Sequence, residues 1–278
     1  MEDRKIIFLD IDGTFTVPLE KPTLLAAKAV QEARKNGHKV FISTGRNMPI
    51  VSGDVLAVGF DGVVASAGRH IEIDGKVLRD SVLPEETIQE CLDIFHRCGI
   101  WCRIESPEGI YIDSSLQEIL TNADAELSNS ELVRMKKELT SDVGVKPYTE
   151  YPGKGAYKLG FICTDLNDIE KAKPYLEQEF HFVVHPYGED ADCYNGEIIR
   201  KDMDKGEAME RVCEYYGAVM ADTIAFGDSM NDLQMLQVAG TSVAMGNSCR
   251  ELKESADIVC ESVEDDGIYY EFQRMNLI

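Results

Sequence analysis

Two carboxylates stand one residue apart near the start of the chain, at Asp10 and Asp12. The four apolar residues before them, 6–9, are typical of a buried strand, and Gly13 lets the chain turn away directly afterwards. Acids at the end of a buried strand need a cation, a proton or water, because an unpaired buried carboxylate is costly. The pair is therefore either two solvated loop acids or a site for nucleophilic attack and proton transfer.

Two other apolar segments also end in polar clusters. Residues 38–43 lead into 44–45 (Thr-Gly), and residues 223–226 are followed by the acid-rich segment 228–232. Ligands of open parallel sheets bind at the carboxyl ends of the strands, so we expect the three clusters to converge. Acids brought together in this way repel one another, and a hard cation held by oxygen ligands relieves the repulsion. These features favour Mg²⁺ over zinc.

Such a site suits a phosphate group as its ligand, because protein-bound Mg²⁺ commonly keeps a substrate phosphate among its ligands. Groups able to contact the phosphate oxygens are Thr44, Gly45, Lys205 and Asn231. Asp10 is then placed as a nucleophile that forms an aspartyl phosphate. Asp12 could protonate the leaving oxygen and later deprotonate the attacking water.

The surrounding segments predict an α/β core, Rossmann-like, with a mostly parallel sheet and helices on both faces. Thr23 is a plausible N-cap for a helix that runs to Asn36 between two apolar strands. The same alternation returns after residue 204, with a helix to Tyr216, strands at 223–226 and 241–245, and a closing helix at 263–275. Asp74-Gly75 between apolar residues predicts a hairpin.

Between residues 82 and 187 the predicted elements change to short strands mixed with helices, including a polar helical stretch at 116–139. This pattern predicts an inserted α+β domain with an antiparallel sheet. We therefore expect a catalytic core formed by 1–81 and 188–278, and a cap formed by 82–187.

The composition limits the possible partners. A formal net charge of −22 argues against nonspecific nucleic-acid binding and against anionic membrane surfaces. No apolar run approaches the roughly 18 residues that span a bilayer. The eight Cys form no C-x-x-C pair, and the chain opens without a signal peptide. These features predict a cytoplasmic protein with reduced thiols that acts on a small phosphorylated metabolite, and they leave its oligomeric state open.

The polar clusters also make a family resemblance that covers nearly the whole chain. Segments 10–14, 43–46, 205–206 and 227–232 resemble, in order, the four motifs of the haloacid dehalogenase (HAD)-like hydrolases. The long insertion is similar to the class IIB cap of the Cof-type sugar phosphatases. One departure is that Ser66-Ala67-Gly68 stands where these proteins usually have Asn-Gly, which puts one polar substrate contact in doubt.

The resemblance implies a role for each matched residue. It implies that Asp10 is the phosphorylated nucleophile, that Asp12 is the acid/base and that both are Mg²⁺ ligands, Asp12 through its backbone carbonyl. Asp228 resembles the third protein ligand of the metal. The remaining implied roles are phosphate binding for Thr44, Lys205 and Asn231, positioning of Asp10 for Lys205, and support of the metal site for Asp232.

Other interpretations remain open at this point. Asp232 could be purely structural, and Arg46 could contact phosphate or cap groups, or pair with acids. A phosphosugar mutase could use the same two aspartates, but it needs a basic cluster for a second phosphate, and none is obvious. A phospho-accepting receiver domain also binds Mg²⁺ beside acids, but such domains are about half this length and lack an insertion.

Overall fold

The computed structural model describes residues 4–18, 20–51, 53–122, 145–184, 194–202 and 204–278. The chain forms two compact units, Met1–Asp80 with Met203–Ile278, and Ser81–Asp202. The second unit therefore continues past 187, where the sequence placed its end. The reason is strand β11 (Tyr194–Arg200), which pairs with β9 (Lys158–Cys163) and β10 (Phe180–Val184) of that unit.

The first unit is built on a sheet whose described strands lie in the order β14-β13-β12-β1-β2-β3-β4-β5. The strands from β14 to β3 are parallel, and β4 and β5 form an antiparallel hairpin at one edge. The bounds are β1 Ile6–Leu9, β2 Lys39–Ser43, β3 Gly62–Ala65, β4 His70–Ile73, β5 Lys76–Asp80, β12 Thr223–Gly227, β13 Thr241–Ala244 and β14 Ile258–Val259. Both Asp74 and Gly75 have positive φ, as expected for the predicted hairpin turn.

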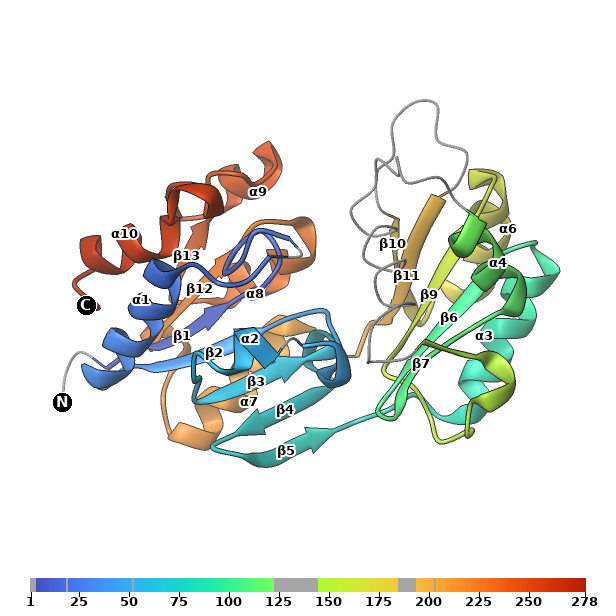
Figure 1. Cartoon of the computed structure of the whole chain (residues 1–278), viewed down its shortest axis with the longest axis horizontal. Coiled ribbons are helices and arrows are strands. Elements are labelled where there is room, and N and C mark those ends of the chain that lie inside the picture. The colour runs from blue at the N-terminus through green and yellow to red at the C-terminus, as the bar shows by residue number, and fades with distance from the viewer. Residues whose placement is uncertain (1–3, 19, 52, 123–144, 185–193, 203) are drawn as a thin grey trace. The chain divides into compact units, whose positions relative to one another are not determined.

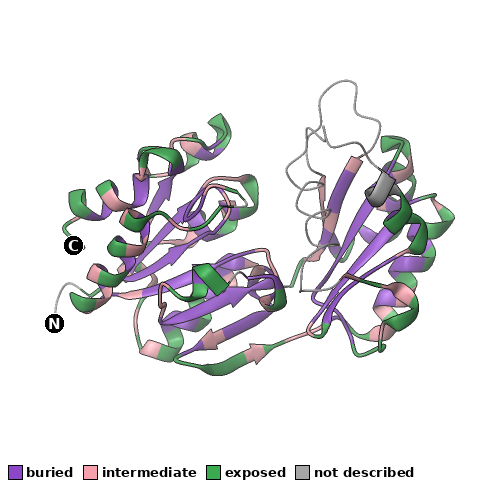
Figure 2. Ribbon diagram, in the orientation of Figure 1, coloured by how far each residue is buried: buried purple, intermediate pink, exposed green. Residues whose placement is uncertain are grey.

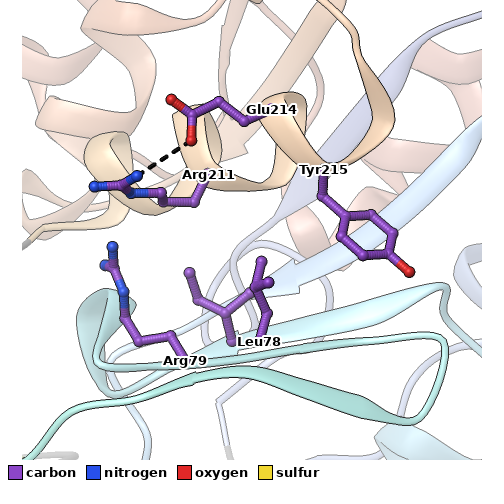
Figure 3. Close-up of a pocket in the computed structure, with 6 residues that line it drawn as sticks. Leu78, Arg79, Arg211, Glu214 and Tyr215 are labelled. Carbon is purple, nitrogen blue, oxygen red and sulfur yellow. Dashed lines mark hydrogen bonds and ion pairs between the residues drawn. The ribbon is translucent and has the colours of Figure 1, made fainter.

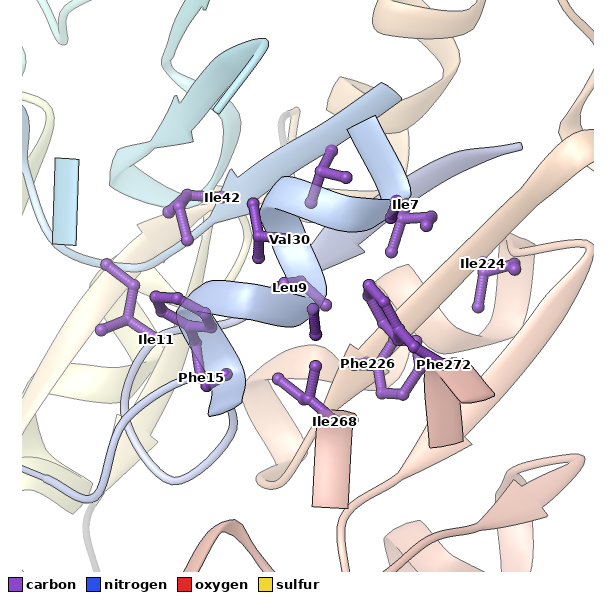
Figure 4. Close-up of a cluster of buried hydrophobic side chains, with 14 of the residues drawn as sticks. Ile7, Leu9, Ile11, Phe15, Val30, Ile42, Ile224, Phe226, Ile268 and Phe272 are labelled. Carbon is purple, nitrogen blue, oxygen red and sulfur yellow. The ribbon is translucent and has the colours of Figure 1, made fainter. Parts of the chain in front are cut away.

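Helices cover both faces of this sheet (Figure 1). One face packs on α1 (Leu24–Lys35), α2 (Gly53–Leu56) and α10 (Gly267–Arg274), and the apolar cluster between them is drawn in Figure 4. The other face packs on α7 (Lys205–Tyr216), α8 (Leu233–Val238) and α9 (Arg250–Ser255). The predicted α/β core is confirmed.

The apolar run of β1 is explained by this two-sided burial (Figure 2). Ile7 and Leu9 belong to the cluster under α1, whereas Ile6 and Phe8 belong to the cluster under α7. Because successive side chains point to opposite faces, a strand covered on both sides must be apolar at every position.

Local signals set the helix ends. Thr23 caps α1 and accepts a hydrogen bond from the Ala26 N–H at 3.0 Å. The predicted closing helix at 263–275 is wrong in one respect. A 3₁₀ turn at Val263–Asp265 is separated from α10 by Asp266, whose φ of 53° interrupts the helix.

The second unit has a sheet in the order β10-β11-β9-β6-β7-β8, antiparallel except for the β7–β8 pair. Its other helices and strands within the described residues are α3 Glu85–Arg97, β6 Trp101–Ser106, β7 Gly109–Ile112, α4 Ser114–Asn122, β8 Val145–Pro147 and α6 Leu166–Leu176. The predicted α+β insertion is confirmed. Most of the helical stretch expected at 116–139 lies outside the described residues; α4 accounts for its start.

No helix among the described residues is both long and apolar enough to cross a membrane. The seven described cysteines are all free thiols.

The strand order places a switch point beside β1. From β1 the chain moves through β2 and β3 in one direction, and it returns later through β12 and β13 on the other side. Leu9 pairs with Ile42 of β2 and with Phe226 of β12, so all three strands end at one level. Residues that follow them meet at one edge, which is where doubly wound sheets bind ligands.

Candidate active site

The centre of this edge is a contact between Asp10 and Lys205, which are 195 residues apart. The Lys205 ammonium lies 2.5 Å from Asp10 Oδ1 and 2.5 Å from Asp232 Oδ1. All three side chains are almost fully buried, with exposed fractions of 7%, 2% and 0% for Asp10, Lys205 and Asp232. The ammonium therefore bridges two carboxylates away from water.

Local structure explains how Lys205 reaches this position. Asp204 is the N-cap of α7, and its side chain accepts from the Glu207 N–H at 2.9 Å, which fixes the first turn of the helix. Lys205 is the first helical residue, where the helix dipole disfavours a cation. The two carboxylates opposite it supply the compensation.

Asp228 joins the cluster from the end of β12. Its Oδ1 accepts from the Thr14 hydroxyl at 3.1 Å, and its backbone N–H donates to Asp232 Oδ2 at 3.1 Å. Asp232 Oδ2 also accepts from the Ser229 N–H, as part of a capping box. Both oxygens of Asp232 are thus engaged by protein groups, whereas no hydrogen bond from the described residues engages Asp228 Oδ2.

Gly13 makes the close approach of the first turn to Asp228 possible. Its φ is +85°, and a Cβ at this position would lie 2.3 Å from Asp228 Oδ2. The Gly13 carbonyl accepts from the Asn247 amide at 2.8 Å, and Asn247 Oδ1 accepts from the Val263 N–H. Asn247 therefore ties the first turn to the end of the chain, a role that nothing in the sequence pattern predicted.

Burial dominates the electrostatics of this cluster. Burial, reinforced by the charge of Asp232, raises the pKa of Asp10 well above its ordinary value, and Lys205 opposes the shift. Burial and Asp232 likewise raise the pKa of Asp228 to about 7. Burial disfavours the charge of Lys205, but Asp10 and Asp232 outweigh it and raise the Lys205 pKa. Without a further cation the cluster holds more negative charge than one ammonium neutralises.

Asp12 lies outside this buried cluster and pairs with Arg46. The Arg46 Nε and Nη2 atoms donate to the two oxygens of Asp12 at 2.7 and 2.5 Å. The carboxylate is 30% exposed and the guanidinium 12% exposed. Such a bidentate pair fixes the direction of the carboxylate. The sequence left the partner of Arg46 open, and the structure identifies it as the predicted acid/base.

Thr44 and Gly45 follow β2 at the same edge. The Thr44 hydroxyl accepts from the Arg46 N–H at 3.1 Å, and its own proton has no hydrogen-bond acceptor among the described residues. The Thr44 N–H donates to the Val64 carbonyl at 2.8 Å, so only the hydroxyl of this residue remains for a phosphate. A Cβ on Gly45 would meet nothing within 4 Å, so the backbone there is open to approach.

The Ser66-Ala67-Gly68 turn holds this loop in place. The N–H groups of Ser66 and Ala67 donate to the carbonyls of Arg46 and Thr44 at 2.8 and 3.0 Å. All three residues of the turn have positive φ, and a Cβ on Gly68 would lie 2.6 Å from the Asp204 carbonyl. The segment that departs from the expected Asn-Gly pair therefore packs against both the Thr44 loop and the start of α7.

Asn231 is exposed on the turn after β12, and its side-chain carbonyl accepts from the Ser229 hydroxyl at 2.6 Å. Within the described part of the chain, no hydrogen bond or ion pair joins it to Asp10 or Lys205. The structure thus brings Asp10, Asp228, Asp232 and Lys205 together and leaves Asn231 at the rim of the group.

The donor set fits a hard divalent cation. Carboxylate oxygens of Asp10, Asp228 and Asp232 lie within 4.8 Å of one another. All of these donors are oxygen atoms, and the cluster carries excess negative charge, which together favour Mg²⁺. The engaged oxygens of Asp232 suit support of the metal site better than direct ligation, whereas Asp10 and Asp228 retain free lone pairs.

A separate pocket of about 470 Å³ lies on the same unit, lined by Ile71, Leu78, Arg79, Arg211, Glu214 and Tyr215 (Figure 3). Its arginines are already neutralised. Arg79 forms an ion pair with Glu207, and Arg211 contacts Glu207 and Glu214 at 3.0 and 3.2 Å. This pocket is therefore a poor phosphate site, in contrast to the edge of the sheet that carries Asp10.

The fold and the buried acid cluster define a class of protein, the two-unit α/β proteins with an acidic site at a strand switch point. The sequence profile of the haloacid dehalogenase-like hydrolases matches residues 7–272. The chain belongs to this family.

Individual relatives agree with this assignment. The putative phosphatase YkrA of Bacillus subtilis (strain 168) is 30% identical over 99% of both chains. The 5-amino-6-(5-phospho-D-ribitylamino)uracil phosphatase YitU of the same organism is 26% identical, over 95% of this chain and 94% of its own. The HAD subclass IIB sugar phosphatase BT4131 shares the fold, with a TM-score of 0.79, 21% identity, and coverage of 99% of this chain and 100% of its own.

Proposed function

We propose that the protein is a Mg²⁺-dependent phosphatase that hydrolyses small phosphate monoesters through an aspartyl phosphate on Asp10. The observation that carries the proposal is the buried Asp10 carboxylate, held at 2.5 Å by Lys205 beside Asp228 at the switch point of the sheet. A carboxylate buried with one fixed ammonium and one free oxygen is pre-positioned to attack phosphorus.

In the first step, the free oxygen of Asp10 attacks the phosphorus atom, and the bond from phosphorus to the alcohol oxygen breaks. Asp12 gives a proton to that leaving oxygen. In the second step, Asp12 takes a proton from a water molecule, whose oxygen attacks the same phosphorus atom. Inorganic phosphate leaves, and the Asp10 carboxylate is restored. Arg46, which binds both oxygens of Asp12, orients the carboxylate for both transfers.

Other residues are proposed to bind Mg²⁺ and to support the site that holds it. Asp10, the backbone carbonyl of Asp12 and Asp228 would hold Mg²⁺, which neutralises charge on the phosphate and on the cluster when bound. Asp232 supports this site by fixing Lys205 and the backbone of Asp228.

The Thr44 hydroxyl, Gly45, Lys205 and Asn231 are proposed to contact the phosphate oxygens. The Thr44 hydroxyl has a proton to donate, and the backbone at Gly45 is unobstructed. Lys205 supplies a fixed positive charge close to the attacking oxygen.

Sugar phosphates are the substrate class that we propose first. The support is that one structural neighbour is a sugar phosphatase and one relative acts on a phosphorylated ribityl compound. The free thiols favour a cytoplasmic location, where such metabolites occur.

A panel of phosphorylated metabolites, assayed for inorganic phosphate with and without Mg²⁺, tests the proposal. We expect Mg²⁺-dependent release from several sugar phosphates, with no bisphosphate cofactor required. Asp10→Asn should abolish turnover while its circular dichroism spectrum stays that of the wild type. Asp222→Asn, a change at an exposed carboxylate, is the matched control. Release of phosphate by Asp10→Asn at the wild-type rate would refute the mechanism. Transfer between substrates without phosphate release would instead identify a mutase.

A further inference from the structure

A second group of metal-ligating side chains lies on the other unit of the chain. Across the described residues, two groups of three such side chains have donor atoms within 4.8 Å of one another. The first is the Asp10 cluster. The second consists of His96, Cys102 and Asp113, and the phosphatase mechanism makes no use of it.

Three elements bring these residues together. His96 lies in the last turn of α3, Cys102 is the second residue of β6, and Asp113 follows β7 directly. The His96 Nε2 atom is 3.1 Å from Asp113 Oδ2. The donors therefore come from a helix end and two adjacent strands rather than from one local turn.

Backbone hydrogen bonds hold Cys102 and Asp113 in register. The Cys102 N–H donates to Asp113 Oδ2 at 2.8 Å, and the Asp113 N–H donates to the Cys102 carbonyl at 3.3 Å. The carboxylate is thus oriented by the backbone of the neighbouring strand, as is usual for ligands of built metal sites. Its Oδ1 atom accepts no hydrogen bond from the described residues.

The site has one buried side and one open side. Cys102 is 2% exposed, the Asp113 side chain 16% and the His96 side chain 46%. His96 therefore forms the solvent-facing side of the group and Cys102 its buried side. A histidine–aspartate pair at a helix end accounts for two of the residues. Cys102 belongs to the apolar cluster of this unit, and its thiol lies within reach of both other side chains.

We propose that His96, Cys102 and Asp113 bind one Zn²⁺ ion. One nitrogen, one sulfur and one oxygen donor form a borderline-soft set, unlike the oxygen-only set around Asp10, and such a set selects zinc over magnesium. A tetrahedral zinc site places its donors about 3.3–3.8 Å apart, so donor–donor distances of up to 4.8 Å must shorten by at most about 1.5 Å. On binding, the ion replaces the thiol proton, which is released to solvent, and water completes the coordination.

Such an ion would cross-link the end of α3 to β6 and to the residue that precedes α4. Its expected effect is to stabilise the second unit, because an ion that binds only the folded state shifts the unfolding equilibrium by mass action. Phosphoryl transfer at Asp10 needs no contact with it, so the two proposals stand or fall separately.

Titration of the chelator-treated full-length protein with Co²⁺ tests the proposal, with excess Mg²⁺ present to occupy the Asp10 site. Thiolate coordination of Co²⁺ produces a charge-transfer band in the near ultraviolet, which oxygen-only sites do not give. We expect the band to saturate at one equivalent and to disappear when Zn²⁺ is added. Absence of the band would overturn the proposal.

Variants assign the ligands. Cys102→Ser should remove the band, whereas Cys249→Ser, at an exposed thiol on the other unit, should keep it. Because Cys102 is buried, His96→Ala provides a second test at an exposed position and should weaken Co²⁺ and Zn²⁺ binding at least about tenfold. His181→Ala, at an exposed histidine of β10, is its control. Wild-type affinity in His96→Ala, or a band that survives Cys102→Ser, would contradict the assignment.

Discussion

Replacing Lys205 with Met tests the electrostatic core of the site directly. The ammonium contacts two carboxylates at 2.5 Å, and it is 2% exposed. Fully ionised, the three aspartates and this lysine carry a charge of −3 + 1 = −2, and the substitution leaves −3. Removing one partner of a buried ion pair costs about 3–5 kcal/mol. That is a large part of the 5–15 kcal/mol typical of a folded domain.

The loss of folding free energy in Lys205→Met should depend on pH in a defined direction. Lys205 stays charged throughout the neutral range because its pKa is raised above an already high value. In the variant, Asp10 and Asp232 face each other without a cation, so protonation relieves the repulsion. The folded variant binds more protons than the unfolded chain, and its stability therefore falls as pH rises. We expect the deficit to be largest near pH 8 and smallest near pH 5.

Urea unfolding followed by far-ultraviolet circular dichroism, at both pH values and with and without Mg²⁺, measures the effect. Added Mg²⁺ should stabilise the variant more than the wild type, because it meets one more unit of negative charge. Lys39→Met is the control. Lys39 contacts Asp61 at 2.8 Å, but its side chain is 38% exposed and Arg34 also binds Asp61, so about 1 kcal/mol or less is expected. If Lys205→Met is as stable as wild type at pH 8 without Mg²⁺, the bridge does not exist in solution.

Three further outcomes are expected at the same edge of the sheet. Arg46→Met should lower kcat about 10–100-fold with little change in KM, because Asp12 loses the group that orients it; an unchanged kcat would contradict that role. The affinity for Mg²⁺ should rise about tenfold between pH 6 and pH 8, since Asp228, with its pKa raised to about 7, must lose a proton to bind the ion. Without Mg²⁺, the same raised pKa stabilises the fold below about pH 4, and this contribution is lost as pH rises to about 7. Calorimetry in buffers of different ionisation enthalpy checks the proton release, and equal affinities at the two pH values would exclude it. Gly13→Ala should weaken Mg²⁺ binding and lower the melting temperature, because the new Cβ would lie 2.3 Å from Asp228 Oδ2. Gly75→Ala, which has a similar positive φ but no atom within 4 Å, isolates the backbone cost.

The parts of the site that follow β1, β2 and β12 could be predicted from sequence for a simple reason. A strand buried on both faces is apolar at every position, so an acid directly after it stands out. Parallel strands then bring such residues to one edge whatever their separation along the chain. Asp10 and Asp228 are recognisable in this way without knowledge of any contact between them.

Contacts that depend on side-chain direction could not be predicted. The pairing of Arg46 with Asp12 and the bridge from Asn247 to Gly13 each join residues from different loops, and neither pair has a characteristic spacing. β11 was missed because Asn195-Gly196, a pair typical of turns, lies inside it. Pairing with strands on both sides outweighs that local preference.

The His96–Cys102–Asp113 group is even harder to predict from the sequence. Its members are separated by stretches that contain a loop and a hairpin, so no short motif contains them. Zinc sites with regular spacing usually take ligand pairs from one turn, which is why a spacing rule finds them. A group assembled across a helix end and two strands becomes visible only when the sheet is known.

Lys205 offsets part of the negative charge that Asp10, Asp228 and Asp232 bring into a buried site, so the site can form before a metal ion binds. In the proposed mechanism Asp10 attacks phosphorus as a carboxylate, yet burial and the neighbouring Asp232 both raise its pKa. The ammonium opposes both effects, and it does so with one charge against three. A second lysine would neutralise the remaining carboxylate charge and so remove the field that attracts Mg²⁺. If the site had no lysine, the raised pKa would keep the proposed nucleophile Asp10 protonated. Under the proposed mechanism, the single buried lysine is therefore a compromise, because it favours the ionised form of Asp10 but leaves excess negative charge for Mg²⁺ to neutralise.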